Sequence, residues 1–368
     1  MSRIVQVANF VTATSGGLRT TLHHLSSGYM GAGHEVIQIL PGRRDAIERD
    51  DRGATRIWLA APAVPGTGYR VHRDTGRVRR ILDRAAPDVL EVHDRTTLRG
   101  LGQWARRGGV PSCVVSHERL DRWLRTWLPT HLPVGHLADR SNESLATSYD
   151  AVVCTTQWAA EEFVRLGIDN LNVIPLGVDA STFIPRIASW QSEEVLLVMT
   201  SRLSREKRPD LAVAAVRELV RRRVPVRLTV CGDGPMRGSL ARASGDLPIH
   251  WRGFVADRAE LASLIARSDV ALAPGPIETF GLGALESLAC GTPVVVNRNS
   301  ALPAIVGEAG RSAASSGWCM ADAVEELLLV DERWRRSLAR RRAELFDWNA
   351  TVQGFLVMHR LSRGAKAA

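Results

Sequence analysis

Residues 274–296 have the sequence PGPIETFGLGALESLACGTPVVV, and this stretch decides the fold. It follows a short apolar run, Val270–Ala273, and ends in a second, Pro293–Val296, and both have the length and composition of buried strands. Between them, Leu282–Ala289 is compatible with a helix packed on a sheet. A strand, a helix and a strand in this order predict parallel strands joined by a right-handed crossover.

The same alternation of strands and helices continues along the whole chain. The other predicted strands are Ile4–Ala8, Glu35–Leu40, Arg56–Leu59, Val89–Val92, Cys113–Ser116, Ala151–Thr155, Asn172–Ile174, Val195–Thr200, Arg227–Cys231 and His250–Gly253. The other predicted helices include Leu18–Gly31, Thr97–Arg107, Pro209–Arg222 and Ala259–Ala266. This pattern predicts an α/β protein with parallel sheets.

A length of 368 residues suits two domains of roughly 150–200 residues each. We predict a Rossmann-like domain over 1–176, a linker over 177–194 and a second Rossmann-like domain over 195–348. A C-terminal helix, about 349–362, is expected to pack back on the first domain. Ligands of open α/β sheets bind beyond the carboxyl ends of the strands, which predicts binding in a cleft between the two domains.

Composition is that of a soluble globular protein, with 45% hydrophobic and 24% charged residues. The N-terminus lacks the pattern of a secretory signal, and no apolar run approaches the roughly 20 residues that span a bilayer. We therefore expect a cytoplasmic protein. The five cysteines are scattered singly, which predicts buried reduced thiols rather than a metal or disulfide framework.

The formal net charge is +9, and the only lysines are Lys207 and Lys366. From Arg333 to the C-terminus, the sequence contains nine basic residues and two acidic ones. Such a segment is compatible with a solvated helix face, with an anionic membrane contact or with nucleic acid, although no nucleic-acid motif supports the last.

Four loops at predicted strand ends are candidate binding elements. The first contains Gly16 and Gly17, where backbone amides could approach an anion, or which could form only a tight turn. The second contains Arg202 and Lys207, whose charges could clamp a diphosphate, although surface charge is an alternative. The third comprises two segments suited to a base pocket or to ordinary turns, containing Gly232, Asp233, Gly253, Phe254 and Val255.

The fourth loop carries two carboxylates eight residues apart. Glu278 lies in the loop and Glu286 within the following helix, and burying either without partners is costly. Phe280, Gly281 and Leu282 begin the helix, where free amides could face a phosphate. In the first domain, His117 follows a strand and could point into the cleft or serve only as a structural residue.

Together, these features resemble the retaining GT-B glycosyltransferases of family 4 over essentially the whole chain. The resemblance rests on the Arg202 and Lys207 pair, on the E-x7-E spacing of Glu278 and Glu286, on the glycine pair and on His117. Within the family, the segments VQVANF, SHERLDR and LAPGPIETFG are most similar to actinobacterial phosphatidylinositol mannoside mannosyltransferases.

The resemblance implies roles for individual residues. Arg202 and Lys207 would hold the donor diphosphate, Glu286 the ribose and Glu278 the transferred sugar. His117 would lie near the 6-hydroxyl of that sugar. The remaining implied donor contacts are the glycines Gly16 and Gly17, the amides of Phe280, Gly281 and Leu282, and the base-lining residues Gly232, Asp233, Gly253, Phe254 and Val255.

Two positions depart from the family pattern. Ser201 stands where glycine is common before the arginine, and Ala304 stands where many members carry glutamate. Any role of that carboxylate is absent from this chain.

The implied reaction is transfer of a hexose, with mannose from GDP-mannose preferred, to a glycolipid such as phosphatidylinositol dimannoside in an α-1,6 linkage. The sequence has no DxD motif to hold a metal, so Arg202 and Lys207 would neutralise the leaving group without a cofactor. We expect front-face attack with retention, because no residue is identified as a nucleophilic carboxylate.

A lipid acceptor agrees with segment 119–140, which mixes aromatic and basic side chains as interfacial helices do. Its candidate acceptor or membrane contacts are Arg119, Arg122, Trp123 and Trp127. A lid or a helix packed on the first domain is the alternative. Contact with this acceptor would place the protein on the inner face of the plasma membrane.

Other functions remain open from the sequence alone. A family 4 enzyme could use a UDP-sugar and a polysaccharide or small-molecule acceptor. A sugar-nucleotide epimerase of the same architecture would need no acceptor, and a non-catalytic nucleotide-sugar or anionic-lipid binding protein would not turn the donor over. A pyridoxal-phosphate phosphorylase would need a Schiff-base lysine, and Lys207 is already assigned to phosphate.

Overall fold

The computed structural model describes residues 1–12, 16–50, 52–65, 67–129, 132–186 and 193–361. Parts of the predicted linker (187–192) and of the basic C-terminus (362–368) lie outside the described residues. The chain forms two compact units. Unit 1 comprises Met1–Leu176 together with Trp348–Ala368, and unit 2 comprises Gly177–Asp347.

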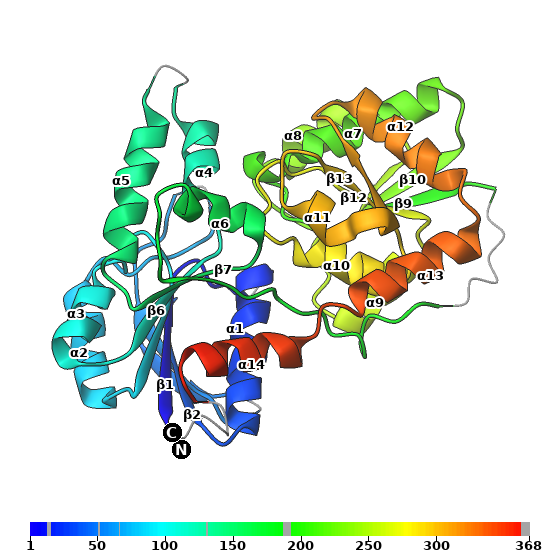
Figure 1. The fold of residues 1–368 in the computed structure, drawn as a ribbon. Helices are drawn as coiled ribbons and strands as arrows, with labels where there is room; N and C mark the ends of the chain where they lie inside the picture. The colour runs from blue at the N-terminus through cyan, green and yellow to red at the C-terminus, as the bar shows by residue number, and fades with distance from the viewer. Residues whose placement is uncertain (13–15, 51, 66, 130–131, 187–192, 362–368) are drawn as a thin grey trace. The chain divides into compact units, whose positions relative to one another are not determined.

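The described part of unit 1 is built on an eight-stranded sheet in the order β3-β4-β2-β1-β5-β6-β7-β8 (Figure 1). Neighbouring strands are parallel except β3 and β4. The strands are β1 (Arg3–Ala8), β2 (Glu35–Gly42), β3 (Ala46–Arg49), β4 (Thr55–Ala60), β5 (Val89–His93), β6 (Ser112–Ser116), β7 (Ala151–Cys154) and β8 (Leu171–Val173). The helices are α1 (Gly17–Gly31), α2 (Thr75–Ala85), α3 (Leu101–Gly108), α4 (Leu120–Trp127), α5 (Val134–Ala146), α6 (Gln157–Val164) and α14 (Trp348–Met358).

The sheet of unit 1 is covered on both faces. The register places Val5 of β1 between Ile37 and Leu90, and these side chains pack in one cluster with apolar residues of α2, α3, α5 and α6. Ile4, which points to the other face, packs in a second cluster with residues of α1 and α14. A sheet buried on both faces explains why its strands are nearly continuous apolar runs.

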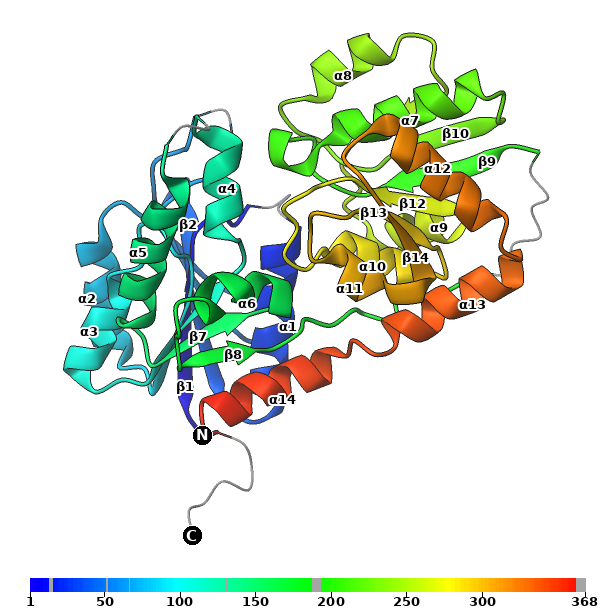
Figure 2. The same cartoon turned by 45° about the horizontal axis from the view of Figure 1, so that its top comes forward.

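The described part of unit 2 has a six-stranded parallel sheet in the order β11-β10-β9-β12-β13-β14 (Figure 2). Its strands are β9 (Val195–Met199), β10 (Val226–Val230), β11 (Ile249–Trp251), β12 (Val270–Ala273), β13 (Val294–Asn297) and β14 (Gly310–Ala313). Its helices are α7 (Pro209–Arg221), α8 (Arg237–Ser244), α9 (Arg258–Ala266), α10 (Leu282–Ala289), α11 (Leu302–Val306), α12 (Gly317–Leu328) and α13 (Glu332–Ala343), with short 3-10 turns at Arg205–Lys207 and Gly307–Ala309.

In both sheets the strand order reverses once, between β1 and β5 in unit 1 and between β9 and β12 in unit 2. At such a switch point the following loops turn in opposite directions and leave a crevice at the carboxyl ends of the strands. The structure therefore confirms the predicted α/β fold of two parallel-sheet domains.

The largest differences from the prediction concern two strands and the start of one helix. The sequence pattern did not predict β3 (Ala46–Arg49), a charged antiparallel edge strand, or β14 (Gly310–Ala313), which contains a glycine. Helix α3 begins at Leu101, four residues after the predicted start at Thr97. The carboxylate of Asp94 accepts hydrogen bonds from Thr96 and Leu98 and holds the intervening chain in a turn.

Several arginines of the basic helix α13 donate hydrogen bonds to backbone carbonyls of unit 2, so this helix is not only a solvated face. Arg336 donates to the carbonyls of Ala266 and Ser268, at the C-terminus of α9. Arg340 donates to Ala289 O at the C-terminus of α10, and Arg342 donates to the carbonyls of the short helix α11. The last carbonyls of a helix have no intrahelical partner and carry partial negative charge, so guanidinium groups stabilise them.

Candidate functional site

A pocket in unit 2 lies at the switch point between β9 and β12. Its wall is formed by the loops that follow these two strands and by the start of α10. Polar members of the lining are Thr200, Ser201, Lys207, Glu278 and Ser287. This is the place where the strand order predicts a ligand.

Lys207 and Glu278 meet in this pocket although 71 positions separate them in the sequence. The ammonium group of Lys207 donates to Oε1 of Glu278 across 2.5 Å. The two side chains are 31% and 18% exposed, so the pair is partly screened from water and remains open to an incoming group. An anionic ligand could therefore approach Lys207 beside a carboxylate suited to hydroxyl groups.

The loop carrying Arg202 and Lys207 is held by the loop after β10. Leu203 N donates to Asp233 O across 3.0 Å. A Cβ at Gly232 would lie 1.9 Å from Ser201 O, so only glycine permits this approach. The structure thus gives Gly232 and Asp233 a supporting role next to the loop that carries Arg202 and Lys207, while contact with a base stays a prediction.

The turn after Lys207 is fixed by Arg208. Arg208 has φ +50° and donates twice to the carboxylate of Asp210, and Pro209 begins α7. A left-handed conformation is uncommon for a residue with a side chain and is costly unless its surroundings impose it. This ion pair therefore helps to hold Arg208 where it joins the Arg205–Lys207 turn to α7.

The start of α10 presents backbone amides beside the same pocket. Gly281 adopts φ +75°, and a Cβ there would lie 2.4 Å from Leu302 Cδ2. Phe280 packs its ring edge-on against Phe346, and Leu282 is buried. The side chains of Phe280 and Leu282 thus fasten the loop to the core, and the backbone is the part that could contact a phosphate.

Glu286 points from α10 toward α9 rather than toward Lys207. Its Oε1 accepts a hydrogen bond from Arg258 Nη2 at 2.9 Å, and the guanidinium of Arg258 lies over the ring of Phe183. Burial raises the pKa of Glu286, and Arg258 opposes this shift. Arg258, which no sequence motif marked as a partner, is the cation that makes a buried carboxylate at position 286 tolerable.

The segment after β11 forms the other predicted edge of a base pocket. Gly253 has φ +80°, Phe254 is 43% exposed and Val255 is buried. An exposed aromatic ring next to a glycine turn is suited to stacking on a flat ring system. Its role as a base contact stays a prediction.

In unit 1, His117 directly follows β6, as predicted. Its Nε2 lies 3.0 Å from Nδ1 of His93, and the two rings are stacked with centroids 5.3 Å apart. Burial, and next the neighbouring His93, lower the pKa of His117 to about 3. The ring is therefore neutral near pH 7 and can donate one hydrogen bond and accept another.

Helix α1 follows β1, one of the two strands at the switch point of unit 1. Gly16 and Gly17 are exposed there, and α1 begins at Gly17. The buried amide of Asn9 joins neighbouring loops, because it donates to Thr97 Oγ1 and accepts from His72 N, each at 2.8 Å. Contact of the Gly16 and Gly17 amides with a donor stays a prediction.

A buried ion pair fastens the segment that contains His117. Arg95 Nη1 donates to Glu162 Oε1 at 2.6 Å and to Ser116 Oγ at 2.9 Å. Glu162 Oε2 in turn accepts from the amide of Leu120 at the start of α4. The ion pair of Arg95 and Glu162 therefore holds both ends of segment 116–120, which contains His117.

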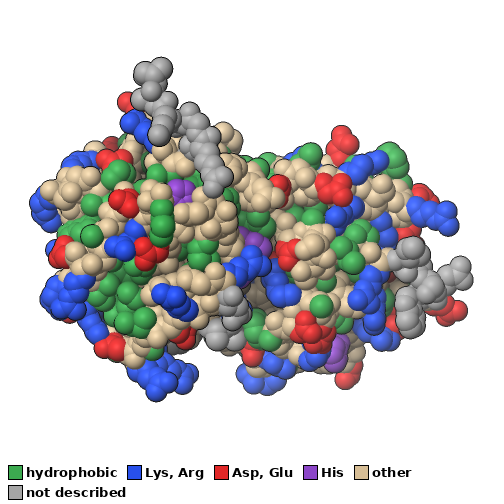
Figure 3. Space-filling model, turned by 90° about the horizontal axis from the view of Figure 1, so that it is seen from below, with side chains coloured by type: hydrophobic (Ala, Val, Ile, Leu, Met, Phe, Trp, Pro, Cys, Tyr) green, Lys and Arg blue, Asp and Glu red, His purple; other side chains and the backbone are tan. Residues whose placement is uncertain are grey.

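Arg119 does not lie on the exposed face of α4, contrary to the interfacial role expected for it. It is 7% exposed, bonds Asp121 and Glu161, and stacks on Trp158. Arg122 and Trp123 do lie on the exposed side, and Trp127 ends the helix. Basic side chains are not confined to α4, and Figure 3 shows them spread among acidic and apolar ones.

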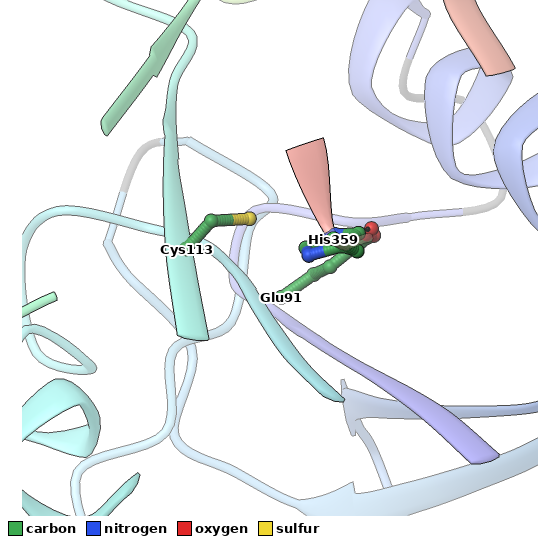
Figure 4. A group of neighbouring side chains, drawn as sticks. All are labelled: Glu91, Cys113 and His359. Atoms are coloured by element: carbon green, nitrogen blue, oxygen red, sulfur yellow. Dashed lines mark hydrogen bonds and ion pairs between the residues drawn. The ribbon is translucent and has the colours of Figure 1, made fainter. Parts of the chain in front are cut away.

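A cluster of polar side chains, not predicted from the sequence, lies between β5, β6 and the end of α14. Glu91 of β5, Cys113 of β6 and His359 after α14 offer ligand atoms within 4.8 Å of one another (Figure 4). Carboxylate, thiol and imidazole are a chemically suitable set for a metal ion. The signal available in the sequence was the strand VLEVH, where period-two alternation puts Glu91 and His93 on one buried face.

Comparisons with known proteins agree with this geometry. Residues 16–177 match the family model described as glycosyl transferase 4-like domain, and residues 194–329 match glycosyl transferases group 1. The chain is 46% identical over 363 residues to a GDP-mannose-dependent alpha-(1-6)-phosphatidylinositol dimannoside mannosyltransferase of Mycobacterium tuberculosis, covering 96% of this chain and 95% of that protein.

More distant proteins are similar in sequence or in fold. A D-inositol 3-phosphate glycosyltransferase of Segniliparus rotundus is 30% identical, covering 61% of this chain and 55% of that protein. Among solved structures, sucrose-phosphate synthase of Thermosynechococcus elongatus superposes with a TM-score of 0.80 at 19% identity, covering 98% of both chains. At that identity the likeness concerns the fold alone.

Proposed function

The chain belongs to glycosyltransferase family 4, and from that premise we propose that it transfers mannose from GDP-mannose to phosphatidylinositol dimannoside with an α-1,6 linkage. The observation that carries this proposal is the 46% identity along nearly the whole chain to an enzyme of that name. The pocket at the switch point of unit 2 supports it, because Lys207 and Glu278 meet there.

In this proposal, the donor diphosphate binds Arg202, Lys207 and the amides at the start of α10. Glu278 then exchanges its bond with Lys207 for hydroxyl groups of the mannose, and Glu286 accepts the ribose hydroxyls beside Arg258. Carboxylates accept two hydroxyls at once, and the cations stabilise the charge that develops on the leaving diphosphate. Two protein cations thus take the place of a metal ion, and no cofactor takes part.

We propose that the acceptor attacks from the same face that the diphosphate leaves. The bond between the anomeric carbon and the diphosphate oxygen breaks, and its electron pair stays on that oxygen. The 6-hydroxyl oxygen of the acceptor forms the new bond, and its proton passes to the departing diphosphate oxygen. The configuration is retained, as expected for an oxocarbenium-like transition state shielded on one face.

The decisive experiment supplies radiolabelled GDP-mannose, UDP-glucose or UDP-N-acetylglucosamine with vesicles that contain phosphatidylinositol dimannoside. We expect label from GDP-mannose alone to enter a lipid with one more mannose. Glu278→Gln should abolish most of the transfer, whereas the exposed control Glu308→Gln should retain it. Release of free mannose without lipid product, or transfer from a UDP-sugar, would reject the donor and acceptor assignment and leave the family intact.

We further propose that the enzyme works at the inner face of the plasma membrane through the exposed side of α4. Trp123 is 36% exposed, and Arg122 and Arg125 are exposed on the same helix. Among the described residues, no helix is long and apolar enough to cross a bilayer. Amphipathic helices with aromatic and basic residues bind anionic interfaces from one side.

Co-sedimentation with vesicles tests this surface. Binding to anionic vesicles should exceed binding to neutral ones and should fall in the double variant Arg122→Glu and Trp123→Ala. Arg107→Glu, an exposed basic position on α3, is the matched control and should bind as the wild type does. Equal binding by both variants would assign membrane contact to another surface.

A further inference from the structure

Glu286 binds the ribose in the proposed function, yet the structure buries this carboxylate inside unit 2. It lies on α10 and is only 7% exposed. Burial raises its pKa above the ordinary value. An ionised carboxylate only accepts hydrogen bonds, as a ribose hydroxyl requires, whereas a protonated one uses an oxygen as a donor. Recognition of the ribose therefore depends on whatever keeps Glu286 charged and fixes its direction.

Arg258, the first residue of α9, supplies the charge opposite Glu286. Its Nη2 donates to Oε1 of Glu286 at 2.9 Å, and its charge opposes the shift of the pKa that burial causes. Among the residues that the structure describes, Arg258 is the one side chain that donates to this carboxylate. A charge-assisted hydrogen bond to one oxygen fixes the orientation of the group. The other oxygen, Oε2, is then left to accept from a ligand.

The guanidinium of Arg258 is itself held in place. It lies over the ring of Phe183, 4.6 Å from the ring centroid, and Phe183 is fully buried. The backbone is fixed as well, because the Asp257 carboxylate accepts from the amides of Ala259 and Glu260 and caps α9. An aromatic face orients a planar guanidinium, whereas the ammonium group of a lysine is a point charge that stacking does not orient.

The two helices that carry this ion pair are also joined near their C-terminal ends. Thr292, just after α10, donates its hydroxyl to the carbonyl of Ile265 on α9 across 2.8 Å. The segment with the predicted base contacts, 253–255, leads directly into the start of α9. Arg258 thus connects the segment expected to contact the base with the carboxylate expected to hold the ribose.

We propose that Arg258, held by Phe183, is a positioning residue for nucleoside recognition: it orients the carboxylate of Glu286 so that Oε2 accepts hydrogen bonds from the ribose hydroxyls of the bound nucleotide. The protein then distinguishes a ribonucleotide from its deoxy form through a residue that need not touch the ribose. The role at the ribose rests on the proposed function, whereas the contacts of Arg258 rest on unit 2 alone.

Loss of the Arg258 charge should disable Glu286 without removing it. A buried carboxylate that loses its counter-charge either takes up a proton or turns toward water. In both cases it no longer offers a fixed acceptor to a hydroxyl group. Arg258→Lys keeps the charge but loses the planar fork and the stacking on Phe183, so it should retain only part of the discrimination between ribose and deoxyribose.

The direct measurement is calorimetric titration of the whole protein with GDP and with its 2′,3′-dideoxy form, which lacks both ribose hydroxyls. We expect the wild type to bind GDP about 10- to 100-fold more tightly than the dideoxy form, the range for hydrogen bonds to a charged group. In Arg258→Met this ratio should fall below about threefold, mainly through weaker binding of GDP. Arg267→Met, an exposed arginine at the C-terminal end of the same helix, is the matched control and should keep the wild-type ratio.

Kinetics and a double variant separate positioning from stability. The ribose hydrogen bonds form equally in the ground state and the transition state, so Arg258→Met should raise the donor KM about 10-fold or more and change kcat less than about threefold. Adding Arg258→Met to Glu286→Ala should cause no further loss of discrimination, because both changes remove the same interaction. A role in stability alone would lower the melting temperature and leave the affinity ratio unchanged.

A wild-type affinity ratio in Arg258→Met would overturn the proposal, and so would a wild type that binds GDP and its dideoxy form equally. An equal loss of affinity for both nucleotides in Arg258→Met would do the same, because it would assign Arg258 to stability. Failure of the proposed function is distinguishable, since a wild type that transfers no mannose still gives a readable affinity ratio. A protein that binds UDP in place of GDP is titrated with UDP and its dideoxy form, and the same variants decide the role of Arg258.

Discussion

Lys207 donates a hydrogen bond to Glu278 across 2.5 Å within the pocket at the carboxyl ends of β9 and β12. The two groups implied to bind the diphosphate and the sugar are thus partners of each other before either meets a ligand. Donor binding would then exchange one ion pair for two new interactions. This arrangement keeps both side chains oriented at little entropic cost.

Replacing Lys207 by methionine should lower kcat for transfer by about 100- to 1,000-fold, because a charge aimed at the leaving group is lost in a partly dry site. Lys207→Arg should recover part of the rate, since the charge remains but its shape changes. Steady-state rates with GDP-mannose and lipid acceptor measure the effect. A rate within twofold of the wild type for Lys207→Met would remove this residue from the mechanism.

Adjacent glutamates on α6 allow a controlled test of the segment that holds His117. Glu162 is fully buried against Arg95, whereas Glu161 is 60% exposed and pairs with Arg119. Glu162→Gln should cost about 3–5 kcal/mol of unfolding free energy, because the buried Arg95 loses its counter-charge. Glu161→Gln should cost less than about 1 kcal/mol. Urea unfolding of both variants measures the difference, and equal losses would contradict the assignment.

The pKa of His117 predicts a specific pH dependence of stability. It is lowered to about 3 by burial and next by His93, so between that pH and about 6.5 the unfolded chain binds more protons here than the folded protein. The contribution of neutral, buried His117 to the free energy of unfolding is therefore fully present above about pH 6.5 and is lost as the pH falls. From pH 7 to 5 the wild type should lose up to about 2 kcal/mol more than His117→Gln. Urea unfolding measures both proteins at the two pH values. Equal losses of unfolding free energy in the wild type and in His117→Gln would contradict this prediction.

The sequence predicted those features that depend on local pattern. Strand positions follow from short apolar runs, and loops such as Ser201–Lys207 are found at the strand ends where binding residues gather. The edge strands β3 and β14 were not predicted because their residues are largely charged or small and lack the apolar pattern of a buried strand.

Contacts between distant residues could not be predicted in the same way. Arg258 and Glu286 are 28 positions apart, and only the packing of α9 on α10 shows that they pair. Arg119 lies in a segment with the composition of an interfacial helix, but its side chain is buried because it pairs with Glu161 and stacks on Trp158, both on α6. The cluster of Glu91, Cys113 and His359 depends on the register of β5 and β6 and on the position of the residue after α14, which no single segment of sequence encodes.

A final prediction concerns the basic helix α13, because its arginines bind backbone carbonyls within unit 2. Arg340 donates to the carbonyls of Phe183 at 2.9 Å and Ala289 at 3.0 Å, and it is only 24% exposed. Arg340→Met leaves these carbonyls without their charged donor and should cost about 2–3 kcal/mol of unfolding free energy. Arg333→Met, an exposed position on the same helix, should change it by less than about 0.5 kcal/mol. If the basic helix served only a membrane surface, both variants would be equally stable and would differ from the wild type in vesicle binding instead.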